Sequence, residues 1–143
     1  MTSEHQKAAL LIRLGDQRYG VPLSAVERVL PMAAVLVLPE SDDGLLGMLN
    51  LHGSVLPVVD PRARLGLVTP GVAAGQRLIL LRGATQFLMW VDEVDDVIAL
   101  SPESVSEVPT SRTSPVVTSV VRLNETIVPL LAPGALEPRV IAT

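Results

Sequence analysis

Residues able to perform acid–base or metal chemistry are few in this chain, and only one group of carboxylates clusters in the sequence. Histidine is the usual acid–base side chain, and the chain has two, His5 near the N-terminus and His52 in a polar turn, neither with a nucleophile next to it. There is no cysteine, which excludes disulfides and thiolate metal sites. Glycine-rich phosphate loops, dinucleotide fingerprints and nucleophile elbows do not occur. The sequence therefore predicts no catalytic residue.

The run Asp92–Asp96 (DEVDD) is the only group of carboxylates that could hold Mg²⁺ or Ca²⁺. Calcium loops spread their ligands over about 12 residues around an internal glycine, and this run does neither. Its first and fourth residues instead have the spacing of a helix capping box, as do Ser24 and Glu27. We expect capping roles for these four residues, a solvated surface for the other two carboxylates, and neither a metal nor another cofactor.

Composition excludes several classes of protein. A net charge of -4, with scattered arginines, argues against nucleic-acid binding. The N-terminal stretch lacks the pattern of a signal peptide, and the longest uncharged stretch, Gly44–Val59, is interrupted by polar residues and proline. We therefore expect a cytoplasmic protein without membrane insertion. A mean hydropathy of +0.45 further suggests apolar surface intended for a partner.

An internal repeat is the strongest organising feature. Tyr19–Leu30 aligns without a gap on Phe87–Ile98, 68 positions later, so that aromatic, valine and polar positions coincide. Each copy predicts a strand, a capped helical turn and a second strand. Because Tyr19 and Phe87 occupy equivalent strand positions, we interpret them as core anchors rather than residues that stack on a ligand.

A second pair of segments aligns 72 positions apart. Gly47–Asp60 lies over Ser119–Ala132, and each has two apolar runs around a polar turn, the pattern of a β-hairpin. Pro57 and Pro129 coincide inside the second run. Because proline cannot donate to a strand ladder, both are expected at an edge or a bulge. Gly53, in the first turn, is expected to have a positive φ.

The repeat predicts the organisation of the chain. The copies span about residues 8–67 and 76–136, joined by a proline- and glycine-containing connector at 68–75, within one domain of residues 8–136. With about five short strands and little helix, each copy is expected to curl into its own barrel. Residues 101–115 are expected to form a surface loop with a helical turn, and residues 1–7 and 137–143 to be flexible. The predicted fold class is all-β.

Three stretches, YGVPLSAVERV (Tyr19–Val29), NLHGSVLPVVD (Asn50–Asp60) and VDEVDDVIAL (Val91–Leu100), occur in this order. Their order and spacing resemble the CheW-like domain of bacterial chemosensory systems. The resemblance covers about residues 8–136. It implies two five-stranded SH3-like β-barrels packed side by side, which agrees with the repeat found from the residues alone.

The resemblance implies a non-catalytic adaptor at receptor arrays. It would couple the cytoplasmic tip of a methyl-accepting chemoreceptor, held in an apolar groove between the barrels, to the regulatory domain of a CheA-type histidine kinase. Contacts with other CheW-like proteins are also implied. The receptor-facing residues carried over are Val26, Arg28, Gly47, Asn50, His52 and Gly53, and Val35 and Val37 are assigned to kinase contacts.

Several positions depart from the family pattern. His52 stands where the family has arginine, and Arg28 where it usually has glutamate; in the second copy Ser119 replaces a glycine and Ala132 an aspartate. In the family pattern the acid and the base can attract each other across neighbouring strands. An exposed ion pair contributes only about 0–1 kcal/mol, so its loss is expected to alter recognition rather than folding.

Other functions stay open at this point. A divergent accessory protein would bind the receptor but not the kinase, or would cap arrays. A barrel for a small ligand or regulatory nucleotide would show arginine-rich turns or a polar cavity. A metal-dependent enzyme would use the acidic run, and a Mg²⁺ or Ca²⁺ titration would detect it.

Overall fold

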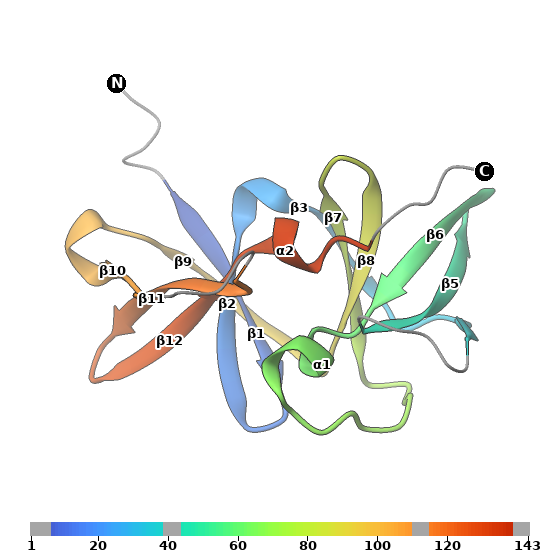
Figure 1. The fold of residues 1–143 in the computed structure, drawn as a ribbon, viewed down its shortest axis with the longest axis horizontal. Helices are drawn as coiled ribbons and strands as arrows, with labels where there is room; N and C mark the ends of the chain where they lie inside the picture. The colour runs from blue at the N-terminus through green and yellow to red at the C-terminus, as the bar shows by residue number, and fades with distance from the viewer. Residues whose placement is uncertain (1–6, 39–43, 110–114, 139–143) are drawn as a thin grey trace.

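The computed structural model describes residues 7–38, 44–109 and 115–138. Two six-stranded sheets and two short helices make up most of it, with sheet A at the left of Figure 1, sheet B at the right, and the helices between them. The helices are α1 (Pro61–Leu65) and α2 (Pro133–Leu136). The strands are β1 (Ala8–Leu14), β2 (Gln17–Pro22), β3 (Val26–Pro31), β4 (Leu36–Val37), β5 (Leu45–Leu51), β6 (Ser54–Val59), β7 (Arg77–Arg82), β8 (Gln86–Val91), β9 (Glu93–Ala99), β10 (Val105–Glu107), β11 (Val117–Leu123) and β12 (Thr126–Leu131).

The strand order is β10-β11-β12-β2-β1-β9 in sheet A and β3-β7-β8-β6-β5-β4 in sheet B. The predicted all-β class is confirmed. Each sheet has six strands rather than the five predicted, because each includes one very short strand, β4 with two residues and β10 with three.

Each sheet contains strands from both copies of the repeat. The hairpin β1–β2 of the first copy joins β9–β12 in sheet A, and the hairpin β7–β8 of the second copy joins β3–β6 in sheet B. The expectation that each copy curls into a barrel of its own is therefore wrong. The chain crosses between the sheets directly after β2 and again after β8, so each copy places its first hairpin in the sheet formed mainly by the other.

The exchanged hairpins are buried on both faces over most of their length, which explains why β1, β7 and β8 are mostly apolar. The remaining strand, β2, begins with Gln17 and Arg18. Alternate residues of β7 and β8, among them Leu78, Leu88 and Trp90, pack with other residues of sheet B into a core of that sheet alone. Ala9 and Leu11 belong to the corresponding core of sheet A. The intervening residues of the hairpins belong to a shared core between the sheets, which also includes Val59, Val116, Leu131 and Leu136. The hairpin residues in it are Leu10, Ile12, Leu14, Tyr19, Val21, Ile79, Leu81, Phe87, Met89 and Val91.

The two copies are equivalent in register. Pro57 lies opposite Met48, and Pro129 lies opposite Val120. Each proline directly precedes the residue where its strand begins to pair in parallel with an exchanged hairpin. The missing N–H therefore falls just outside that pairing, where proline is tolerated.

The predicted capping boxes are wrong. The 3₁₀ turn Leu23–Ala25 has no side-chain cap, and no helical turn separates β8 from β9. Glu27 and Asp95 are instead the extra residues of equivalent β-bulges. Their carboxylates pair with the neighbouring hairpins, Glu27 with Arg82 Nε at 3.3 Å and Asp95 with Arg13 Nε at 3.0 Å. A bulge leaves one residue of the bulged strand outside the ladder. In both copies that residue is an acid.

The remaining expectations concern the chain ends and one loop. Within the predicted loop 101–115, residues Pro102–Ser104 form a 3₁₀ turn and β10 follows; residues 110–114 lie outside the described residues. Most of the predicted flexible ends, including His5, also lies outside them. Glu137 is described, and it is held by hydrogen bonds to Ala84 and Thr85.

Candidate docking surface

Five of the residues carried over as receptor-facing lie at one end of sheet B. β3 begins where β7 ends, and β6 runs parallel to β8, which begins at that same end. The turn between β5 and β6 therefore reaches the end of the sheet where β3 starts. We call this place the hairpin end of sheet B; Figure 1 shows it toward the top of the view. Its predicted residues are Val26, Arg28, Asn50, His52 and Gly53.

The β5–β6 turn at this end has a fixed backbone shape. His52 has a φ of 52° and Gly53 a φ of 92°, as in the two-residue turns that match the twist of a hairpin. The positive φ predicted for Gly53 is confirmed. The Asn50 side-chain oxygen accepts a hydrogen bond from the Gly53 N–H at 2.9 Å. His52 is exposed at the tip of this turn, so its imidazole faces the solvent from a backbone of fixed shape.

Gly47 has a different role, because it lies under the short edge strand β4. A Cβ at this position would collide with the Leu36 carbonyl oxygen. Gly47 therefore allows β4 to approach β5 closely. Val37, one of the residues assigned to kinase contacts, is 51% exposed on β4, whereas Val35 is half-buried against the core of sheet B.

Arg28 and Val26 point to opposite faces of β3 because of the bulge. Val26 pairs with Leu81 and packs against the shared core, whereas Arg28 pairs with Leu80, whose side chain faces the core of sheet B. The expectation that positions 28 and 52 lie on neighbouring strands is wrong, since β7, β8 and β6 lie between β3 and β5 in the strand order. Arg28 is exposed and forms no ion pair or hydrogen bond with the described residues.

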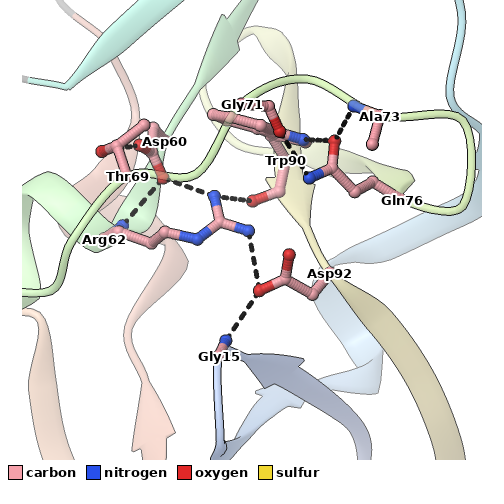
Figure 2. A network of polar contacts seen from close by, with 9 residues as sticks. All are labelled: Gly15, Asp60, Arg62, Thr69, Gly71, Ala73, Gln76, Trp90 and Asp92. Carbon is pink, nitrogen blue, oxygen red and sulfur yellow. Dashed lines mark hydrogen bonds and ion pairs between the residues drawn. The ribbon is translucent and has the colours of Figure 1, made fainter.

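A buried polar network lies beside α1, away from the hairpin end (Figure 2). Arg62 is 1% exposed and forms an ion pair of 2.8 Å with Asp60, which also caps α1 by accepting from the Arg62 N–H. The guanidinium lies 4.5 Å from the centre of the Trp90 ring, close enough for a cation–π interaction. The Thr69 hydroxyl donates to the other oxygen of Asp60 at 2.7 Å.

The same network joins the two sheets. Asp92, where the chain crosses from β8 to β9, lies 3.1 Å from Nη2 of Arg62 as an ion pair without good hydrogen-bond geometry. Asp92 also accepts a 2.6 Å hydrogen bond from the Gly15 N–H in the β1–β2 turn of sheet A. Gln76 bonds to Trp90 Nε1 at 2.8 Å and to the main chain of Gly71, which holds the connector against sheet B (Figure 2). Asp60 and Asp92 neutralise the buried guanidinium, whereas its Nε and Nη2 atoms form no hydrogen bond with the described residues.

Sequence reasoning missed this network, although one signal was available. Asp60 and Arg62 directly follow a strand that ends in the buried residues Val58 and Val59. Opposite charges so close to a buried strand end favour a paired, capping arrangement. The second copy has Ala132 and Gly134 at the equivalent places, and so it cannot form the same pair.

Chemical groups do not converge elsewhere in the described part of the chain. No group of three or more His, Asp or Glu side chains there could hold a metal ion. A shallow hollow of about 340 Å³ beside Arg62 includes Leu14, Asp16 and Leu67 in its lining, but the guanidinium is already neutralised by two aspartates.

Tyr19, whose pKa is raised by burial, and Phe87 lie in the shared core, so neither ring is available to stack on a ligand. Among the described helices, none is long and apolar enough to span a membrane.

Known proteins resemble this chain over most of its length. The family model described as CheW-like domain matches residues 8–139. A probable chemotaxis protein CheW of Rhizobium etli is 27% identical over 108 residues, which cover 75% of this chain and 70% of that protein. The chemotaxis protein CheW of Rhizobium meliloti is 29% identical over 101 residues, covering 70% of this chain and 65% of that protein.

The fold has a solved counterpart. The crystal structure of scaffolding protein TtCheW from Thermoanaerobacter tengcongensis matches with a TM-score of 0.81 at 22% identity, covering 92% of each chain. At that identity the similarity establishes the fold alone. The family match, which extends over nearly all of the 143 residues, shows that the chain belongs to the CheW-like domain family.

Proposed function

We propose that this protein is a non-catalytic adaptor that couples methyl-accepting chemoreceptors to a CheA-type histidine kinase in the cytoplasm. One observation carries the proposal. Arg28 on β3 and His52 in the β5–β6 turn, two of the receptor-facing positions implied by the family, are both exposed at the hairpin end of sheet B.

Kinase contacts are assigned to the edge of sheet B formed by β4. Leu36 and Val37 are 68% and 51% exposed there, an apolar pair on a strand with one unpaired edge. Apolar edge strands of this kind favour protein partners. The corresponding edge strand of sheet A, β10, exposes Ser106 and Glu107 instead of an apolar pair.

A second candidate function is an accessory adaptor that binds the receptor without the kinase. It is favoured by the charges at the hairpin end, where a permanent cation at position 28 and an imidazole at position 52 replace the family's acid and base. This reading predicts receptor binding together with undetectable binding to the kinase regulatory domain.

Isothermal titration with purified partners tests both readings. The titrants are a cytoplasmic tip fragment of a receptor and the regulatory domain of the kinase, both from the same genome. The adaptor is used as wild type and as Arg28→Glu with His52→Arg, which restores the family's charges. We expect wild-type binding to both partners and altered affinity for the receptor fragment in the double variant. If neither partner binds, the proposal is wrong; if binding to both is unchanged, positions 28 and 52 do not determine recognition.

A further inference from the structure

The β1–β2 hairpin, which completes sheet A, is joined to the rest of the domain by one short crossing. The family match begins with this hairpin, at residue 8, and only the 3₁₀ turn Leu23–Ala25 separates β2 in sheet A from β3 in sheet B. The turn has no side-chain cap and contains no buried residue, and the Val26 N–H donates to its Leu23 carbonyl. Val26 is already extended, with a φ of -93° and a ψ of 123°. Three residues of weakly anchored backbone therefore decide whether the hairpin folds back onto its own chain.

The strands that hold this hairpin lie near the other end of the domain sequence. β1 pairs with β9 over residues 8–13 and 93–99, and β2 pairs in parallel with β12 at Gly20 and Leu130. Pairing over such sequence distances is slow, because the entropy of a long loop is lost before the contacts form. An identical hairpin from a second chain can occupy the place during that interval, since it makes the same contacts with the same residues.

The second exchanged hairpin, β7–β8, does not have this freedom. It is joined to the fold at both ends, by the connector 68–75 and by Asp92, which leads into β9. Its turn is also held by Glu137, which accepts from the Ala84 and Thr85 N–H groups. Exchange between chains is therefore expected at the first hairpin.

We infer that two copies of this chain exchange their β1–β2 hairpins and form a closed dimer in which each chain completes sheet A of the other. Exchange between equivalent units is characteristic of repeat proteins, and a short connecting segment favours it. In the dimer the Leu23–Ala25 turn is extended, so that β2 continues into β3. The contacts of the hairpin are kept, including the hydrogen bond from the Gly15 N–H to Asp92, which then joins two chains. The dimer carries two copies of the hairpin end and of the β4 edge, and so it is bivalent towards a partner of the monomer.

An engineered disulfide distinguishes hairpin exchange from a simple surface contact, because the chain has no cysteine of its own. Ala8 lies opposite Ala99 across β1 and β9. The Leu100 N–H donates to the Lys7 carbonyl at 2.8 Å, so the next pair, 8 and 99, is of the non-hydrogen-bonded kind, in which the side chains are closer and suited to a disulfide. Ala8→Cys with Ala99→Cys therefore places the bond between the hairpin and the strand that holds it.

The double variant is refolded from urea under reducing conditions at about 10 µM and at about 1 mM, the effective concentration of a flexibly linked segment. Monomer and dimer are then separated by gel filtration and oxidised, and thiol titration checks that the bond has formed. We expect a dimer fraction at least about tenfold larger at the higher concentration. On a non-reducing denaturing gel the dimer should stay covalently joined and the monomer should run as a single chain. Ala8→Cys alone is the control, and its dimer should separate into single chains.

The length of the crossing tests the same inference without a disulfide. An insertion of about six glycine and serine residues between Ser24 and Ala25 should lower the dimer fraction about fivefold or more, because a longer connection closes more easily within one chain. Deleting Leu23–Ala25 should give dimer at both concentrations; if the deletion prevents folding, the insertion and the disulfide decide. Refolding at the higher concentration that gives only monomer, or a dimer of the double variant that separates into single chains on the denaturing gel, would overturn the inference.

Discussion

At the scale of single residues, the described part of the chain is organised by backbone conformation and by the pairing of charged side chains, not by reactive groups. The positive φ of Gly53 could be predicted, because a short polar turn between two apolar runs needs a residue with that conformation. Gly47 matched the family pattern, but its physical role could not be read from the sequence, since it depends on β4 approaching from a segment ten residues away. Arg62 was missed because, besides the neighbouring Asp60, its partners Trp90 and Asp92 come from a distant segment of the chain.

Gly53→Ala should destabilise the protein by about 1–2 kcal/mol, since an alanine at a φ of 92° is strained while no neighbour obstructs its Cβ. Urea denaturation measures the difference. Gly75→Ala is the control, because its Cβ also meets open space and no positive φ is involved. Equal stability of the two variants would contradict the assigned role of the turn.

Arg62→Met should destabilise the fold by about 3–5 kcal/mol, because it leaves Asp60 buried without its cation and Asp92 without its link to α1. Thermal unfolding followed by circular dichroism measures the effect. Arg122→Met, at an exposed position, should change stability by less than about 0.5 kcal/mol. If both substitutions have similar small effects, the network does not hold the sheets together.

At the scale of elements, the hairpins in Gly47–Asp60 and Ser119–Ala132 followed from the sequence, but the roles of the acidic residues did not. A polar residue followed three positions later by an acid fits both a capping box and a bulge, and only pairing with a neighbouring strand distinguishes them. The turns of the exchanged hairpins show a further regularity. Asp92 accepts from the Gly15 N–H in one, and Glu137 accepts from Ala84 and Thr85 in the other.

The Glu137 contact should make stability depend on pH. Partial desolvation raises the pKa of this carboxyl, but hydrogen bonds from Thr85 and Ala84 outweigh it and leave the pKa below its ordinary value. A lowered folded-state pKa contributes stability above the unfolded pKa that is lost as the pH falls through the folded one. Glu137→Gln should therefore be less stable than wild type at neutral pH, with the difference shrinking in acid.

Urea denaturation of both proteins across the range from about pH 7 to pH 3 measures this dependence. Glu125→Gln is the control, because Glu125 is exposed in the β11–β12 turn and its carboxylate makes no hydrogen bond among the described residues. A difference between wild type and Glu137→Gln that stays constant with pH would show that the carboxylate does not act through its charge.

At the scale of the whole molecule, the repeat predicted two similar units but not the exchange of hairpins between them. The alignment of the copies is the same whether each hairpin stays with its own copy or joins the other. The long apolar runs of β1, β7 and β8 were the one indication of burial on both faces. Because each sheet needs strands from both copies, neither half of the chain contains a complete sheet.

Fragments 1–67 and 76–143 should therefore be unfolded when expressed separately and should fold when mixed. Circular dichroism and gel filtration detect the change, and the intact chain cleaved within the connector 68–75 is the control. Cooperative unfolding of either fragment alone would contradict the exchanged architecture.

The central claim for the whole molecule is that it bridges the receptor and the kinase, and co-sedimentation tests this claim most directly. Receptor-containing vesicles are mixed with the full-length kinase from the same genome, with or without this protein, and the kinase in the pellet is quantified. The adaptor function predicts that kinase sediments with the vesicles only when this protein is present. Kinase that stays in the supernatant in the presence of this protein, although the protein itself is folded, would contradict it.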